Sequence, residues 1–125
     1  MFDVELAESA FFAGVKPQQK VMQWHRAEVT RIPQSGQVIA SSADCAVQAL
    51  AIDGHALSTQ FHCEFSPQTV AGWSSLPSYM AVLERELGVG AYERLCEECW
   101  PLMPEMNRVT KMVWDNFKKS SGLKI

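Results

Sequence analysis

A histidine and a glutamate stand two positions apart, at His62 and Glu64, in a stretch that is predicted to form a β-strand. Residues i and i+2 of a strand point to the same face, so the Glu64 carboxylate would lie close enough to accept a hydrogen bond from the imidazole. Such a carboxylate fixes the tautomer and orientation of the ring, which is how a nucleophilic triad holds its general base. The spacing therefore indicates a base and its orienting residue. The alternative is the polar face of an edge strand, with no chemistry.

A metal site is another interpretation, because His62 and Glu64 with a distant second histidine would also describe a two-histidine, one-carboxylate iron site. Such sites normally take their second histidine from a later strand of a barrel. No histidine follows His62, and the second half of the chain is predicted to be helical. We rank this site well below the triad and expect neither a bound metal nor a cofactor. Stoichiometric iron in the purified protein would reverse that order.

The four cysteines do not supply an obvious nucleophile or metal site. Cys96 and Cys99 have the spacing of metal ligands, but a zinc site needs a second ligand pair at such spacing, and the sequence has none. They lie in a predicted helix beside two glutamates that would raise the pKa of a thiol, so we expect them to be small core residues. Cys63 would face away from His62 in a regular strand. We therefore do not interpret it as a displaced nucleophile.

The first half of the chain has the composition of strands separated by turns. Valine, isoleucine, phenylalanine and tryptophan concentrate in the predicted strands 2–6, 18–25, 37–42, 45–52 and 56–64. The clearest turn is Asp53-Gly54, because these residues tolerate the positive φ angles of a tight hairpin. We expect the strands on either side of it to pair antiparallel, and we expect His55, just after the turn, to be solvated.

From Ser66 onward the apolar residues recur with the period of a helix. Ser66 and Pro67 are a typical N-cap and first helical residue, and a second helix over about 77–87 begins at a proline and ends before a glycine. A third helix carries Cys96 and Cys99. A fourth follows two prolines and has an apolar stripe of Leu102, Met106, Val109, Val113 and Phe117.

These elements predict one α/β domain over residues 1–125. It would have a mixed sheet of about five strands within residues 1–65, followed by about four helices within residues 66–121.

Composition excludes several classes of function. The chain has 125 residues, 47% of them hydrophobic, and a formal net charge of -3, which fits a globular domain rather than a disordered chain. Its basic residues are not clustered, so nucleic acid is not an expected partner. No apolar run approaches the roughly 18 residues of a membrane span, and no secretory leader is evident. We expect a cytoplasmic protein with reduced cysteines.

The residues around His62 resemble a family signature. Gln60-Phe61-His62-Cys63-Glu64-Phe65 is similar to the Q-F-H-P-E-[FV] motif of class I glutamine amidotransferase domains, with cysteine in place of the usual proline. The similarity continues upstream, in the family's order and approximate spacing. It runs through Gln23-Trp24-His25, Ile32-Pro33, residues 38–44 and Gln48-Ala49, and it covers most of residues 4–73. From about Pro77 onward it is weak.

The resemblance implies a role for each matched residue. In that family the histidine and glutamate activate a cysteine, which attacks the side-chain amide of glutamine and releases ammonia through a glutamyl thioester. His62 would be the general base and Glu64 its orienting residue. His25 matches a position at the rim of the glutamine pocket, where backbone groups contact the substrate. Trp24 and His25 are therefore candidate substrate-binding residues, with packing as the alternative role for both. Glutamine is thus the implied ligand, and glutaminase chemistry the implied activity.

One part of the family pattern is absent from the sequence. The family's nucleophile lies in a G-x-C-x-G elbow, and none of the four cysteines has such flanking glycines. That elbow precedes the matched motifs in the family, so the chain resembles a truncated, later half of the domain. We expect it to be inactive alone, with the nucleophilic cysteine on a complementary chain. The alternative is a non-catalytic module that covers its exposed apolar surface by self-association, most simply as a homodimer.

Overall fold

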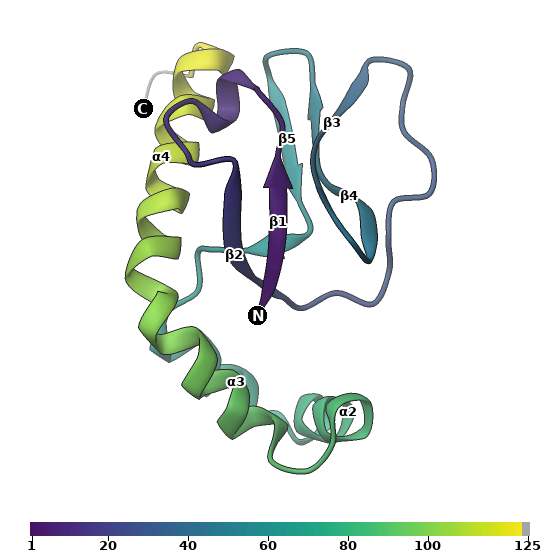
Figure 1. Ribbon diagram of the computed structural model, residues 1–125, viewed down its shortest axis with the longest axis vertical. Coiled ribbons are helices and arrows are strands. Elements are labelled where there is room, and N and C mark those ends of the chain that lie inside the picture. Colours follow the sequence, from purple (N-terminus) through teal and green to yellow (C-terminus); the bar gives the residue numbers. More distant parts are fainter. Residues whose placement is uncertain (124–125) are drawn as a thin grey trace.

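The computed structural model describes residues 1–123, which form a six-stranded sheet with helices beside it (Figure 1). The strands lie in the spatial order β5-β4-β3-β1-β2-β6, and each neighbouring pair is antiparallel. The strand bounds are Phe2–Leu6 for β1, Gln18–Gln23 for β2, Gly36–Ser42 for β3, Cys45–Ile52 for β4, Ala56–Thr59 for β5 and Phe61–His62 for β6.

The predicted α/β class is confirmed, with two corrections to the sheet. Within residues 1–123 the sheet has six strands instead of about five, and its pairings are all antiparallel rather than mixed. Parallel neighbours need a crossover connection, usually a helix. Here the strands are joined by turns and loops, of which one contains the short 3₁₀ helix η1 (Ala10–Phe12).

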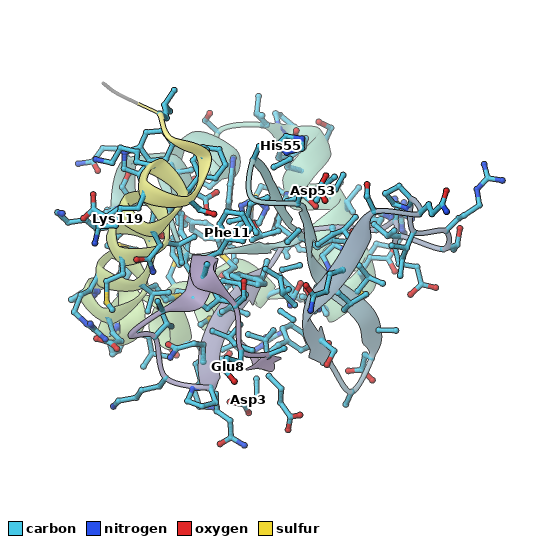
Figure 2. The ribbon with its side chains drawn as sticks, turned by 90° about the horizontal axis from the view of Figure 1, so that it is seen from above. Asp3, Glu8, Phe11, Asp53, His55 and Lys119 are labelled. Atoms are coloured by element: carbon cyan, nitrogen blue, oxygen red, sulfur yellow. The ribbon has the colours of Figure 1, made fainter. Side chains whose placement is uncertain are left out.

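β4 and β5 form the predicted hairpin, with Ile52 opposite Ala56. Asp53 has a φ of 50°, and Gly54 is not one of the residues with positive φ. The left-handed position of the turn is therefore taken by aspartate, one of the few residues with a side chain that tolerate it. His55 is exposed, as predicted, and Figure 2 shows Asp53 and His55 close together at this turn.

The prediction of one strand over residues 56–64 is wrong. β5 pairs with β4 at one end of the strand order, β6 pairs with β2 at the other end, and Gln60 alone separates them. The Gln60 N–H donates to the carbonyl of Gln48 in β4 at 2.8 Å, so β2 cannot use it. β2 accordingly ends at Gln23 instead of residue 25. The sheet curls, because only one residue joins its two terminal strands.

The first two helices lie at their predicted positions. Ser66 caps α1 (Pro67–Ser74) in a reciprocal capping box, in which the Thr69 N–H donates to the Ser66 hydroxyl at 3.2 Å and the Ser66 N–H to the Thr69 hydroxyl at 3.3 Å. α2 (Pro77–Leu87) begins at its proline and is followed by Gly88, whose φ of 84° suits glycine. Local capping residues thus set these bounds.

The last two helices are joined by a 3₁₀ turn. α3 spans Ala91–Cys99, η2 spans Trp100–Leu102, and α4 spans Met103–Ser121. The predicted stripe is confirmed within α4, where Met106 and Val109 are buried and Val113 and Phe117 pack against the core. Leu102 also packs against the core, but it belongs to η2. α4 starts before Pro104 rather than after it, since a proline in the first helical turn removes no intrahelical hydrogen bond.

The core lies between α4, η1 and the sheet. Phe11 of η1 is 2% exposed, and its ring stacks on Phe117 of α4 with centroids 6.1 Å apart. Figure 2 shows Phe11 near the centre of the molecule, with Glu8 and Lys119 at its periphery. The Asn116 side-chain amide donates to the carbonyls of Phe11 and Ala13, which fastens α4 to the loop between β1 and β2. None of the helices in residues 1–123 combines the length and apolar character needed to cross a membrane.

Candidate functional site

His62 and Glu64 make the contact that their spacing predicts. Nδ1 of His62 lies 2.6 Å from Oε1 of Glu64. An ionised carboxylate can only accept a hydrogen bond, so the imidazole donates through Nδ1–H and the neutral ring has an unprotonated Nε2. Among residues 1–123, no hydrogen bond engages that nitrogen. The His62 side chain is 32% exposed, so its Nε2 is available as a base at the surface of the molecule.

Glu64 is held on both of its oxygens. Oε1 accepts from His62, and Oε2 accepts from the backbone N–H of Cys63 at 3.0 Å. Burial raises the pKa of the Glu64 carboxyl, but the hydrogen bond from His62 and the backbone donors outweigh it and hold that pKa below its ordinary value. The carboxylate is therefore ionised at neutral pH. It can fix the ring and stabilise an imidazolium when His62 takes up a proton.

A pair of stacked tryptophans lies next to His62, and one of the two contacts its ring. In the β2–β6 pairing Met22 lies opposite His62, and Trp24 follows Met22 by two residues. Trp24 stacks on Trp73 of α1, with ring centroids 5.1 Å apart and 14° between the planes. Trp73 meets the His62 ring edge-on at a centroid distance of 6.2 Å. Trp24 is thus connected to His62 through Trp73.

His25 is separate from this group. Its Nδ1 donates to the carbonyl of Ala27 at 2.8 Å, and its Nε2 lies 2.7 Å from Oε1 of Gln23. β2 ends at Gln23, so His25 lies in the following loop rather than at the end of a strand. The described hydrogen bonds and ring contacts do not join it to His62.

Two residues of the aromatic group were not singled out as site residues in the sequence. They are Trp73, which touches both Trp24 and His62, and Tyr79, whose ring is tilted against Trp24 at 6.2 Å. Trp73 lies at the end of the stretch that resembles the family, which is a signal that could have indicated it. For Tyr79, at the start of α2, no such signal exists, because its contact depends on how α2 packs.

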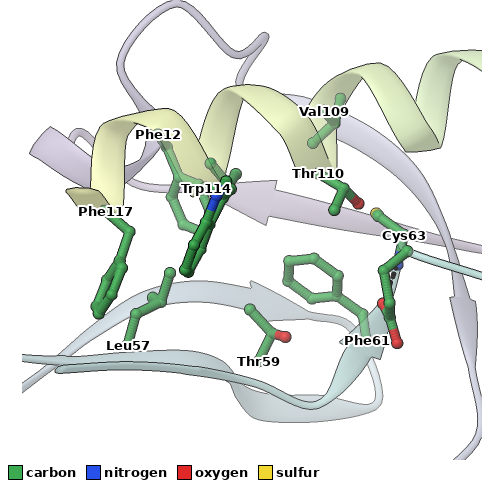
Figure 3. Close-up of a pocket in the computed structure, with 11 residues that line it drawn as sticks. Phe12, Leu57, Thr59, Phe61, Cys63, Val109, Thr110, Trp114 and Phe117 are labelled. Atoms are coloured by element: carbon green, nitrogen blue, oxygen red, sulfur yellow. Dashed lines mark hydrogen bonds between the residues drawn. The ribbon is translucent and has the colours of Figure 1, made fainter. Parts of the chain in front are cut away.

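Cys63 lies just after β6 and faces a cavity that His62 does not line, in agreement with the predicted opposite orientation. The cavity has a volume of about 300 Å³, and Cys63 lines it together with other residues of the same stretch: Leu57, Thr59, Phe61 and Glu64. Figure 3 shows these side chains and those of α4 around the cavity. Burial, with the nearby Glu64 charge, raises the pKa of the Cys63 thiol to about 12. The thiol is therefore protonated at neutral pH and is a poor nucleophile.

The other cysteines are structural in this fold. Cys96 and Cys99 are buried in α3, as predicted, and burial raises the pKa of the Cys99 thiol to about 11. Cys45 is buried in β4, and all four thiols are free. No group of three or more metal-binding side chains comes together in the described part of the chain.

The comparison with family models gives the family of this chain, and the solved structures give its fold. The model of the family described as glutamine amidotransferase class-I matches residues 2–72. Among solved structures, a glutamine amidotransferase from Thermotoga maritima matches with a TM-score of 0.80 and 20% identity, over 93% of this chain and 48% of that chain. A glutamine amido transferase from Methylobacillus flagellatus matches with a TM-score of 0.72 and 21% identity, over 95% of this chain and 51% of that chain.

The matches cover nearly all of this chain but only part of each solved structure. The chain spans about half the length of the solved structures that it matches. At these identities the two structures show a shared fold. No curated protein matches the chain.

Proposed function

This chain belongs to the class-I glutamine amidotransferase family, and on that premise we propose that it supplies the base of a glutaminase site. Nε2 of His62 takes the proton from a cysteine thiol, and the thiolate attacks the side-chain carbonyl carbon of glutamine. The tetrahedral intermediate collapses as His62 returns the proton to the leaving ammonia. Water then hydrolyses the glutamyl thioester, which yields glutamate and restores the thiol.

The observation that carries this proposal is the 2.6 Å contact between His62 and Glu64. Glu64 keeps the proton of the neutral ring on Nδ1, which leaves Nε2 as the atom that accepts the thiol proton. The same carboxylate then faces the imidazolium that forms. This is the division of labour between a base and its orienting residue in a nucleophilic triad.

We place the nucleophilic cysteine outside residues 1–125. The four cysteines of the chain are buried, and Cys63 is both held protonated and directed away from His62. The isolated chain is therefore expected to be inactive, and a complementary polypeptide segment provides the thiol. The free thiols fit a cytoplasmic location, where cysteines stay reduced.

Trp24 and His25 are the proposed substrate contacts. Trp24 stacks on Trp73, next to the His62 ring, so it is placed to form one wall of a glutamine pocket. His25 is fixed by its two hydrogen bonds in the loop after β2, where neighbouring backbone groups could contact glutamine.

The test is ammonia release from glutamine by the chain alone and by the chain mixed with a partner polypeptide. A first partner is the part of the Thermotoga maritima amidotransferase outside the matched 48% of that protein. Sequencing the DNA upstream of the Met1 codon is a second test. It shows whether a neighbouring gene or an in-frame extension encodes a G-x-C-x-G elbow. We expect activity only with a partner that carries such an elbow. No ammonia from any pairing would contradict the proposal.

A second candidate function is a non-catalytic module that associates with its own copies. Large apolar side chains favour it, because Trp114 at the cavity of Figure 3 is 46% exposed and Leu87 is 60% exposed. β5 is also a terminal strand within the described sheet. This candidate predicts a homodimer in sedimentation at high concentration. A monomer over the whole concentration range would count against it.

A further inference from the structure

Gln60 lies at the point where the chain changes its pairing partner. β5, just before it, is bonded to β4, and β6, just after it, is bonded to β2 at the opposite end of the strand order. His62 follows two residues later. The contacts that hold Gln60 in place therefore also set the start of β6 and the position of the His62 ring.

Both the backbone and the side chain of Gln60 are bonded to β4. The backbone N–H donates to the carbonyl of Gln48 at 2.8 Å. The side-chain amide donates to the carbonyl of Val47 at 2.8 Å and lies 3.3 Å from the sulfur of Cys45. Gln60 thus donates hydrogen bonds to two successive carbonyls of β4, at the point where the pairing of the chain with β4 ends.

An irregularity in β4 creates this arrangement. Ala40 and Ser42 of β3 pair with Ala49 and Cys45 of β4, so a single residue of β3 faces the three residues 46–48 of β4. Extra residues in such a bulge are not fully paired in the ladder. The Val47 carbonyl lies in the middle of that stretch, where it accepts from the Gln60 amide.

We propose that Gln60 is a positioning residue, which places His62 by anchoring the start of β6 to the bulge of β4. The role rests on the proposed function, because it assigns importance to the orientation of His62. Gln60 does not itself touch the reacting atoms. It acts by setting the backbone from which the His62–Glu64 pair projects.

The chemistry of the side chain makes the role specific. Glutamate in this position would set a carboxylate against the Val47 carbonyl, and methionine has a similar shape but no donor. Asparagine keeps the amide but is one methylene shorter, so it no longer reaches Val47 from the same backbone position. Gln37 provides a matched control, because it is an exposed glutamine in β3 whose side chain has no hydrogen bond to residues 1–123.

The experiment is nitrogen NMR of the imidazole of His62 in the full chain, which needs no turnover. In the wild type, protonated Nδ1 and unprotonated Nε2 give widely separated nitrogen shifts, because Glu64 fixes the tautomer. In Gln60→Met and Gln60→Asn we expect the two shifts to move toward each other, since the ring is no longer held in one orientation. Gln37→Met should leave them unchanged.

Folded variants with wild-type His62 shifts would overturn the proposal. Loss of the folded state in both Gln60 variants would also overturn it, because a positioning residue acts within an intact fold. If the reconstituted enzyme is active, Gln60→Met should lower kcat by about tenfold to a hundredfold with little change in KM. Absence of ammonia release from the wild type would count against the proposed function and leave the NMR comparison valid.

Discussion

The indole rings of Trp24 and Trp73 stack with their centroids 5.1 Å apart and their planes 14° from parallel. The pair joins the residue just after β2 to α1, and Trp73 also contacts the His62 ring edge-on. A contact between elements that are far apart in sequence therefore forms one side of the candidate site. Trp73 therefore contributes both to the stability of the fold and to the position of the His62 ring.

Replacing Trp73 by alanine should destabilise the chain by about 2 kcal/mol, because it removes a half-buried aromatic side chain and its stacking contact with Trp24. Urea denaturation followed by circular dichroism measures this change. Trp100→Ala is the matched control, because Trp100 is 52% exposed, and it should change stability by less than about 0.5 kcal/mol. Equal losses in the two variants would contradict the assigned contact.

Glu64 predicts a pH dependence of stability with a definite sign. Its contacts hold the pKa of the folded carboxyl below the ordinary value of 4.5. A lowered folded pKa stabilises the fold above the unfolded pKa, and this contribution is lost as the pH falls through the folded pKa. Wild-type stability should therefore fall more steeply below pH 4.5 than that of Glu64→Gln.

Denaturant midpoints measured over that acid range test this prediction. Glu28→Gln serves as the control, since Glu28 is exposed and forms no ion pair with residues 1–123. It should keep the wild-type slope. A Glu64→Gln profile parallel to that of the wild type would show that the carboxylate makes no favourable contact in the folded state.

Cys63 should react slowly with iodoacetamide in the folded chain. With a pKa of about 12 instead of 9.0, its thiolate fraction near neutral pH is lower by about a thousandfold. Mass spectrometry of the labelled peptides, with the urea-unfolded chain as reference, measures the rate. Rapid labelling of Cys63 in the folded chain would show an accessible thiolate and would reopen its interpretation as a nucleophile.

Replacing Gly122 or Gly72 by alanine should change the free energy of unfolding in opposite directions. Gly122 ends α4 with a φ of 69°, so Gly122→Ala should cost about 1 kcal/mol. Gly72 lies inside α1 with nothing within 4 Å of an added Cβ, so Gly72→Ala should stabilise by about 0.5 to 1 kcal/mol. Thermal or urea unfolding distinguishes the two. Changes of the same sign would contradict the assigned helix end.

Local signals were sufficient for most elements of the fold. The capping serine at Ser66, the proline at Pro77 and the glycine at Gly88 act on their own helix ends, so the bounds of α1 and α2 could be predicted from sequence. The His62–Glu64 contact was likewise predictable, because it needs only the spacing of two positions between the residues, although β6 ends at His62 and Glu64 lies just beyond it.

The break at Gln60 could not be predicted from the same pattern. Leu57, Thr59, Phe61 and Cys63 all line one cavity, so the alternation of side chains continues across the break as far as Cys63. Glu64, beyond the end of β6, also lines that cavity. What changes there is the pairing partner, from β4 to β2, and that choice depends on distant strands. The contact of Trp73 with His62 was missed for a related reason, since it depends on how α1 packs against the sheet.

Glutamine hydrolysis by the chain combined with an elbow-carrying partner, compared between His62→Ala and His55→Ala, tests the role of His62 most directly. His55 is an exposed turn residue, so its variant should retain wild-type ammonia release. His62→Ala should lower kcat by about a hundredfold to ten-thousandfold, because it removes the base. Equal activity of the two variants in an active mixture would contradict the assignment of His62 as the catalytic base.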